Sequence, residues 1–316
     1  MFLMTELEFI PVEDIKVKKG MTVNDLLITM KDAGGFTARK LAEATDIAET
    51  MISEKGCLRV LSFPACIMAT GTRGVIVDMV RNGMVDLIIT TCGTLDHDIS
   101  RTYASYYKGD FMMDDADLRA HEVSRLGNIL VPDSCYGIVL EDNLLPMFDE
   151  IFAESKDMTT HKIIDEVGKR MVHEDSLLHQ CHLKNVPIVV PGITDGSFGS
   201  QLWTYYQMHR GLRIDLFGDE QMLAEMTMEA EKMGAIIIGG GISKHHVIWW
   251  SQFREGLDYC VYLTTAQEFD GSLSGAPIRE AVSWGKVKSD ASKMTVEGDA
   301  TITLPLIYAG LADRLL

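Results

Sequence analysis

Long hydrophobic runs and paired cysteines are missing from this sequence. No stretch approaches about eighteen consecutive apolar residues, so we expect no membrane-spanning helix and no membrane partner. The first residues turn acidic too early for a signal peptide. The six cysteines are isolated, without a C-x-x-C pair or a disulfide-framework spacing, at Cys57, Cys66, Cys92, Cys135, Cys181 and Cys260. These absences predict an unexported protein of the reducing cytoplasm.

An excess of basic residues is also absent. The chain has 46 acidic and 29 basic residues, and its formal net charge is -17. Binding to nucleic acid requires lysine and arginine patches that displace phosphate counterions, so we expect no nucleic-acid partner. A cationic partner would be attracted to such a chain, although this charge is more often only that of a well-solvated surface.

Metal-binding and hydrolase motifs are scarce. His179, Cys181 and His182 have a spacing that attracts metals, but two or three ligands on one turn without a partner elsewhere do not make a structural zinc site. We therefore predict no metal. The sequence has neither the nucleophile elbow of Ser/His/Asp hydrolases nor a P-loop.

Short apolar, β-branched runs alternate with amphipathic segments from residue 57 onward. This alternation predicts an α/β fold with a doubly wound, mostly parallel sheet and helices on both faces. The expected strands are "CLRVLSF", "VDLIIT", "NILVP", "VPIVVP", "LRIDLF", "GAIIIGG" and "DYCVYLTT". Before them, a Gly34-Gly35 break predicts two short helices. We expect one domain, residues 21–316, after an N-terminal extension, residues 1–20.

The segments that follow the expected strands combine glycine with threonine, serine or aspartate. Ligands of open parallel sheets bind beyond the carboxyl ends of the strands, where glycine lets the backbone approach a bound group. The relevant segments are "PACIMATGTRG", "TCGTLDHD", "PGITDGSFGSQ", "GGGISKHH" and "TTAQEFDGSLSG". None is a complete G-x-G-x-x-G, and turn geometry alone also requires such residues. Together they favour a nucleotide-type site.

A lysine ends the segment "EAVSWGK", residues 280–286. In an extended segment Trp284 and Lys286 would share one face, and a desolvated Lys286 amine could attack a carbonyl or an imine. The alternative is an ordinary surface lysine. His245, beside His246, could transfer protons near a ligand, or be a solvated residue of a helix start. The acids Asp96, Asp98, Asp195, Glu268, Asp270 and Glu280 could hold a ribose or a polycation, or only cap helices.

Five motifs together resemble deoxyhypusine synthase of the archaeal type. They are "TDGS" (194–197), "GGG" with "KHH" (239–246), "TTAQEFDGS" (264–272), "SGA" (274–276) and "EAVSWGK". The resemblance implies a Rossmann-like homotetramer that binds NAD between paired subunits. It implies oxidation of spermidine with NAD, transfer of the aminobutyl group to an enzyme lysine as an imine, and then to one lysine of the initiation factor 5A precursor.

The resemblance also implies roles for individual residues. Lys286 is the imine-forming lysine, and His245 handles protons and binds substrate. Trp284 and Glu280 bind the polyamine, together with the pair Asp96 and His97. NAD-binding positions are implied at Ala65, Cys66, Ile67, Met68, Ala69, Thr91, Cys92, Gly93, Asp195, Thr265, Asp299 and Ala300.

Three departures separate this chain from familiar eukaryotic members of that family, one of them at a pair of residues. Leu273 and Ser200 stand where those members have aspartate, and Asp96-His97 stands where they have two glutamates. A trication needs matching carboxylates, so these departures affect the polyamine more than the cofactor. They motivate one alternative, a homospermidine-synthase-like transfer to a free amine such as putrescine. Another alternative is a non-catalytic NAD-binding protein.

Overall fold

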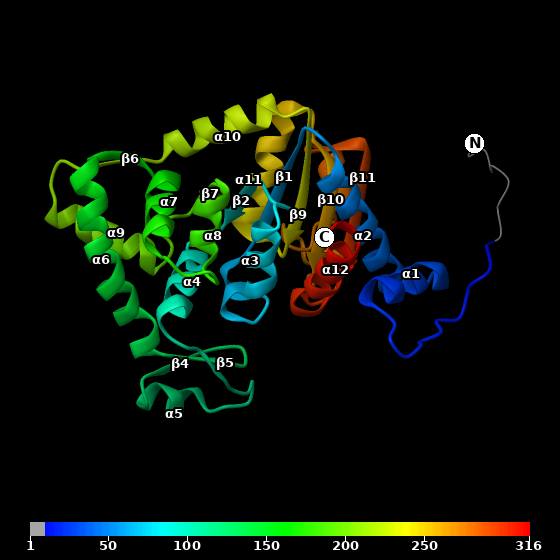
Figure 1. Cartoon of the computed structure of the whole chain (residues 1–316), viewed down its shortest axis with the longest axis horizontal. Helices are drawn as coiled ribbons and strands as arrows, with labels where there is room; N and C mark the ends of the chain where they lie inside the picture. Colours follow the sequence, from blue (N-terminus) through cyan, green and yellow to red (C-terminus); the bar gives the residue numbers. More distant parts are fainter. Residues whose placement is uncertain (1–9) are drawn as a thin grey trace.

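A parallel sheet forms the centre of the computed structural model, which describes residues 10–316 (Figure 1). Within this range the sheet has six strands in the order β11-β10-β9-β1-β2-β7. If these six strands are numbered by their order in the chain, they lie across the sheet as 6-5-4-1-2-3. Read from the opposite edge this is 3-2-1-4-5-6, which is the strand order of Rossmann folds. The strands are β1 (Cys57–Phe63), β2 (Leu87–Thr90), β7 (Ile188–Val189), β9 (Lys232–Ile238), β10 (Leu257–Thr264) and β11 (Val287–Glu297).

Side chains of the strands alternate between two apolar layers. In β1, Leu61 and Phe63 belong to one layer, whereas Leu58 and Val60 belong to the other. The larger layer packs against helices that include α2, α3 and α12, and the smaller one against α10 and α11. The predicted parallel sheet with helices on both faces is therefore confirmed. The helices are α1 (Val23–Ala33), α2 (Phe36–Ser53), α3 (Arg73–Arg81), α4 (Gly93–Tyr103), α5 (Asp115–Ala120), α6 (Gly137–Glu154), α7 (Thr160–Arg170), α8 (Leu177–Lys184), α9 (Ser197–Met208), α10 (Phe217–Glu229), α11 (Gly241–Ser251) and α12 (Ala300–Leu315).

Two predicted strands lie outside the central sheet, which corrects their assignment to it. The run "NILVP" forms β5 (Ile129–Pro132), which pairs antiparallel with β3 (Tyr107–Lys108) and β4 (Val123–Leu126). The run "LRIDLF" forms β8 (Arg213–Asp215), which pairs with β6 (Asp157–Thr159). Both strands are mostly half-exposed, unlike β1, β2, β9 and β10 of the central sheet. A short apolar run does not reveal which sheet it joins.

The segment around Trp284 is a turn, which corrects the predicted extended conformation. Residues Ile278–Val282 form a 3₁₀ helix, Ser283 is helical, and Gly285 has a φ of 68°. A left-handed φ is accessible to glycine at little cost, so Gly285 reverses the chain just before β11. The turn still brings the side chains of Trp284 and Lys286 together.

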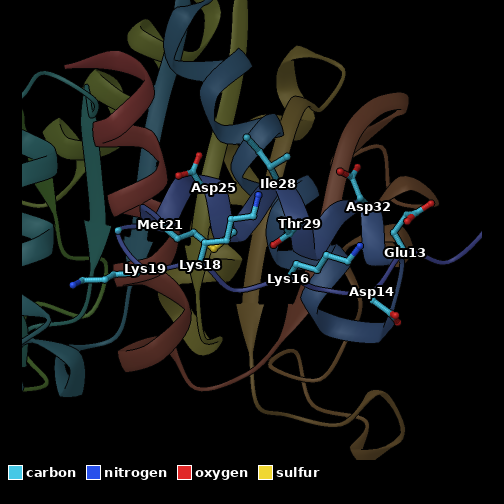
Figure 2. Close-up of a pocket in the computed structure, with 11 residues that line it drawn as sticks. Glu13, Asp14, Lys16, Lys18, Lys19, Met21, Asp25, Ile28, Thr29 and Asp32 are labelled. Carbon is cyan, nitrogen blue, oxygen red and sulfur yellow. The ribbon is translucent and has the colours of Figure 1, made fainter.

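The N-terminal part has the predicted break at Gly34-Gly35, between α1 and α2. A capping box between Thr22 and Asp25 begins α1, whereas α2 is longer than predicted, at 18 residues. Residues 10–19 of the predicted extension run outside the regular elements, and residues 1–9 lie outside the described range. A cavity of about 720 Å³ lies between this extension and α1. Figure 2 shows the side chains of Lys16 and Lys18 along it. No helix within residues 10–316 has both the length and the apolar character needed to cross a membrane.

Candidate active site

A cavity of about 530 Å³ lies at the carboxyl ends of β1, β9 and β10, and we call it the strand-end cavity. It lies where the strand order reverses, between β1 and β9, which is the usual ligand site of a doubly wound sheet. Figure 1 shows the antiparallel projection that carries β4 and β5. Residues of this projection also line the cavity, among them Phe111 and Leu126. The fold therefore forms the crevice that the glycine-rich segments predicted.

Tight contacts between the loops after β1 and β2 shape this edge of the sheet. The backbone N–H of Ala65 donates to Thr91 Oγ1 at 2.9 Å. A Cβ atom on Gly93 would lie 2.9 Å from the Cβ of Ala65, so only glycine fits there without a shift. Arg101 of α4 fixes the same loop by donating to the Met68 carbonyl at 2.7 Å.

The predicted cofactor-binding residues divide into three groups. Five of them line the strand-end cavity, namely Cys66, Ile67, Thr265, Asp299 and Ala300. Six others, Ala65, Met68, Ala69, Thr91, Cys92 and Gly93, belong to the loops behind or beside it and do not line it. Asp195 is exposed after β7 and also lies outside the lining. Asp299 caps α12 by accepting from the Thr301 N–H at 2.7 Å, so the positive end of that helix dipole is close to the cavity.

Asp96 is buried and holds the start of α9. Its carboxylate accepts from the N–H groups of Ser197 and Phe198 at 2.9 and 2.7 Å and from the Tyr136 hydroxyl at 2.8 Å. Burial raises the pKa of this carboxyl group against the effect of those hydrogen bonds. In this chain Asp96 therefore fixes the loop that follows Asp195, and its role toward a substrate stays a prediction.

His97 is a neutral hydrogen-bonding group. Its Nδ1 lies 2.9 Å from the Tyr106 hydroxyl, and its ring packs against the rings of Tyr106 and Tyr136. Burial, assisted by the Arg101 cation, lowers the pKa of His97 to about 4. A neutral imidazole does not replace the charge of a carboxylate toward an ammonium group.

A second cavity, of about 480 Å³, lies between α11 and the segment 273–286, and we call it the lysine cavity. Four predicted residues line it together: Lys286, His245, Trp284 and Glu280. Side chains that the sequence interpretation had not assigned to a site also line it, including Lys244, Ile248, Trp249 and Gln252. Residues that are far apart in the sequence thus meet around the predicted reactive amine.

Lys286 is anchored through its backbone and surrounded by aromatic rings. Its carbonyl accepts from Ser251 Oγ at 2.7 Å and from the Leu257 N–H at 3.1 Å. Its Nζ lies 5.6 Å from the centroid of the Trp284 ring and 5.9 Å from that of Trp249. These distances fall in the range of cation–π contacts, which hold an amine in place without supplying a counter-charge.

His245 is close to the amine. Its ring is stacked with that of Trp249, the two centroids lying 5.8 Å apart. Burial and the Lys286 cation both lower the pKa of His245, so this imidazole is neutral and able to accept a proton. His246 instead lies 3.3 Å from a carboxylate oxygen of Glu220 on α10 and does not line the lysine cavity.

Lys244 is the main functional candidate that the sequence interpretation missed. Its side chain is buried, the residue being 2% exposed, and its Nζ donates to the carbonyls of Leu273 and Ala276 at 2.7 and 2.8 Å. The Nζ also lies 3.7 Å from the centroid of the Tyr262 ring. Burial lowers the pKa of Lys244 to about 8. Its position directly before His245 in "KHH" was the available signal.

The two cavities are separate in a single chain. Their lining residues, taken over the described part of the chain, do not overlap. Lys286 therefore does not line the strand-end cavity of its own chain. The two histidines whose spacing resembled a metal motif each have another partner: His179 Nδ1 bonds to the Gly168 carbonyl, and His182 Nδ1 bonds to Asp165.

Comparisons with known proteins identify the family of the chain. The family model "Deoxyhypusine synthase" matches residues 25–311. Proposed deoxyhypusine synthases from Picrophilus torridus and Thermoplasma acidophilum are each 50% identical to this chain over 299 residues, with 95% of this chain and 96% of theirs covered. One from Sulfolobus acidocaldarius is 45% identical over 301 residues, with the same shares of each chain covered.

Solved structures support the fold. The crystal structure of a proposed deoxyhypusine synthase from Entamoeba histolytica has a TM-score of 0.66 and 20% identity, covering 95% of this chain and 96% of that one. The complex of AgrE with ornithine and NAD+ has a TM-score of 0.56 and 13% identity, covering 89% of this chain and 34% of that one. The extent of the family model and the archaeal relatives decide the family: the chain belongs to the deoxyhypusine synthases, which are transferases.

Proposed function

We propose that the chain catalyses the NAD-dependent transfer of the aminobutyl group of spermidine to one lysine of the initiation factor 5A precursor. The family membership supports an aminobutyl transfer in hypusine formation. The observation that carries the proposal is the lysine cavity, where Lys286, His245, Glu280 and Trp284 surround one space. We place this activity in one domain, residues 21–316, with residues 1–20 as an extension, in the cytoplasm.

The residues of the lysine cavity divide the chemistry among them. Glu280 pairs with the terminal ammonium group of the aminobutyl arm, and Trp284 packs on its methylene groups. Lys286 attacks the imine carbon of oxidised spermidine; the carbon–nitrogen bond to diaminopropane breaks, and diaminopropane leaves. His245 accepts the proton that the attacking amine loses. The lysine of the acceptor protein then displaces Lys286 in the same way.

The strand-end cavity fits a dinucleotide. Thr265, Asp299 and the loop at Cys66 would hold it at the carboxyl ends of the strands, where Rossmann folds bind such ligands. Bound NAD supplies hydride acceptance from the polyamine and hydride return to the product. The start of α12 beside this cavity favours negatively charged phosphate groups.

A second copy of the chain would bring the two cavities together. Hydride transfer requires the amine and the nicotinamide to be adjacent, yet the lysine cavity and the strand-end cavity of one chain share no described lining residue. We therefore propose that NAD binds between paired subunits of a homotetramer, with Lys286 of one subunit next to the strand-end cavity of the partner.

Borohydride trapping tests the proposal. The chain is incubated with spermidine and NAD, reduced with borohydride and digested, and mass spectrometry locates the adduct. We expect one aminobutyl adduct, on Lys286, which is absent from Lys286→Ala and present in the control Lys288→Ala. Lys288 is a suitable control because it pairs with Asp258 outside the lysine cavity. Retention of NAD without an adduct would favour a non-catalytic NAD-binding protein instead.

Two positions that lack an aspartate of familiar eukaryotic members motivate a second candidate function, in which the aminobutyl group passes to a free amine. Leu273 lines the lysine cavity at a position where familiar eukaryotic members of the family have aspartate, and Ser200 is exposed at the start of α9. Radiolabelled spermidine offered together with the initiation factor 5A precursor and putrescine separates the two reactions. Label in the protein acceptor supports the first proposal, and label confined to small amines supports a homospermidine-synthase-like reaction.

A further inference from the structure

Lys244 is a buried amine that the proposed transfer does not use. It lies in α11 directly before His245, and the residue is 2% exposed. Its Nζ donates to the carbonyls of Leu273 and Ala276 at 2.7 and 2.8 Å and lies 3.7 Å from the centroid of the Tyr262 ring. All three partners are neutral, and a methionine would fill the same space without the cost of burying an amine. The hydrogen bonds of Lys244, and not its bulk, therefore distinguish it from an apolar side chain at this position.

The segment 272–276, which contains both carbonyl groups, forms neither a helix nor a strand. Side chains of two neighbouring elements hold its carbonyls instead. The Ser274 carbonyl accepts from the Tyr262 hydroxyl and from Thr264 Oγ1, which both belong to β10. Lys244 supplies the corresponding bonds from α11. Because no strand or helix pattern fixes the segment, its position depends on these side chains.

The lysine cavity lies between two walls that carry different chemical groups. One wall is α11, which contributes His245. The other wall is the segment 273–286, which contributes Glu280 and Lys286. The proposed transfer needs both walls at once, because Glu280 holds the aminobutyl arm and His245 accepts the proton that the Lys286 amine loses. The rate of the transfer therefore depends on the separation of the two walls.

Two polar links join these walls, one near each end of α11. Lys244 makes the link near the start of the helix. Ser251 makes the link at its end, where Ser251 Oγ donates to the Lys286 carbonyl at 2.7 Å. Within residues 10–316 no other hydrogen bond runs between α11 and the segment 273–286. Without the link from Lys244, hydrogen bonds would hold the walls together at one end only.

We propose that Lys244 is a positioning residue for the transfer, which holds the wall that carries Glu280 and Lys286 at a fixed distance from His245. This inference rests on the proposed function and adds a residue to it. Lys244 does not touch the reacting atoms in this scheme, because its Nζ is occupied by two backbone carbonyls of its own chain. It acts through the shape of the cavity. A misplacement of reacting groups by about 1 Å lowers a rate by about 100-fold.

The rate of adduct formation on Lys286, measured by borohydride trapping at saturating spermidine and NAD, tests this role. Lys244→Met removes the donors and keeps an apolar side chain, so the rate should fall by about 30- to 100-fold. Lys244→Gln keeps two N–H donors without a charge and should be about fivefold faster than the methionine variant, as one recovered hydrogen bond predicts.

Lys293→Met is the matched control. The Nζ of Lys293 also donates to two backbone carbonyls, those of Ser289 and Ala291 at 3.0 and 3.2 Å, but this lysine does not line the lysine cavity. Its replacement removes a similar pair of hydrogen bonds and should leave the rate of adduct formation unchanged.

Hydrogen–deuterium exchange and calorimetric titration with NAD distinguish positioning from a general loss of structure. Lys244→Met should increase amide exchange within residues 272–286, because the segment loses its link to α11. Amide exchange in β1 and β9 and the affinity for NAD should stay at the wild-type values. Neither readout requires the transfer reaction, so both report on the link even where no adduct forms.

Three outcomes would overturn the inference. A Lys244→Met variant with the wild-type rate would show that the cavity keeps its shape without the amine. Equal losses in the methionine and glutamine variants would show that the hydrogen bonds do not position the segment. Loss of NAD binding together with adduct formation would show that Lys244 only supports the fold. Failure of the proposed function is distinct from all three, because the wild-type chain itself would then form no adduct on Lys286.

Discussion

The side-chain nitrogen of Lys286 lies 5.9 Å from the centre of the Trp249 ring, which projects from α11. The same ring is stacked with His245, so one aromatic side chain touches both the predicted nucleophile and the predicted proton acceptor. Trp284 approaches the amine from the other sequence segment, at 5.6 Å. The position of the amine therefore depends on α11 as much as on its own segment.

Removal of the Trp249 ring should slow the formation of the Lys286 adduct. A partly exposed cation–π contact contributes about 1 kcal/mol, so Trp249→Ala should lower the rate of borohydride-trapped adduct formation about fivefold. Trp249→Phe keeps an aromatic face and should stay within about twofold of the wild-type rate. Equal rates in the alanine variant and the wild-type chain would show that Trp284 alone positions the amine.

The free energy of unfolding should increase at alkaline pH because of Lys244. The pKa of this lysine is lowered from 10.5 to about 8, so between these values the unfolded chain binds more protons than the folded one. The folded state bears the cost of the buried charge below pH 8, and this cost disappears as the pH rises toward 10.5. The free energy of unfolding should therefore increase by about 3 kcal/mol over this range.

Urea unfolding at pH 7.5, 8.5 and 9.5 measures this effect as a difference between the wild-type chain and Lys244→Met. The methionine variant lacks the titrating group, so the stability difference should move in favour of the wild-type chain as the pH rises. Lys40→Met, which removes a surface lysine paired with Glu297, is the control for the loss of a lysine that is not buried. A constant difference for Lys244→Met would contradict a lowered pKa.

The sequence predicted the residues of the lysine cavity well because they form short contiguous motifs. Lys286, Trp284 and Glu280 come from one segment, and His245 from another, and the structure places all four around one cavity. Their catalytic roles stay predictions. Lys244 was not predicted as a site residue, because a lysine in a helix usually faces solvent. Its burial depends on the packing of Leu273 and Ala276 against α11, which the sequence does not reveal.

The central sheet was predictable for a related reason. Strands that are buried on both faces, such as β1 and β9, are apolar at most of their positions, and this leaves a nearly continuous signal. The edge strand β11 is mostly half-buried or exposed and is rich in polar residues, so no such run marks it. The short β5 and β8 give apolar runs without belonging to the sheet. Pairing partners, which the local pattern does not contain, decide these cases.

Acid should destabilise the folded chain through His97. Burial lowers the pKa of this residue from 6.5 to about 4. Between these two pH values the unfolded chain therefore binds a proton at His97 that the folded chain does not bind. The free energy of unfolding should fall by about 3 kcal/mol between pH 6.5 and 4 from this source. His97→Asn, which retains a hydrogen-bonding group for Tyr106 but does not titrate, should reduce that fall in urea unfolding measured at several pH values. An unchanged pH profile would mean that His97 titrates normally.

Asp98 should contribute more to stability than other acids of the chain. It is 0% exposed, and its carboxylate accepts from Arg73 Nε at 2.8 Å, from the Ser176 hydroxyl at 2.8 Å and from the Leu177 N–H at 2.9 Å. These bonds join α3 and α4 to the start of α8. Removing one partner of a buried ion pair leaves the other charge without compensation, so Asp98→Asn should lower the free energy of unfolding by about 3–5 kcal/mol.

Two further variants distinguish the lost pairing from a general effect of losing a carboxylate. Asp117→Asn changes an exposed acid and should shift the free energy of unfolding by no more than about 0.5 kcal/mol. The double variant Asp98→Asn with Arg73→Met removes both charges and should lose clearly less than the sum of the two single variants, because neither charge is then left unpaired. Simple additivity in urea unfolding would show that Arg73 and Asp98 stabilise the fold independently, and that the hydrogen bonds to α8 account for the whole effect of Asp98.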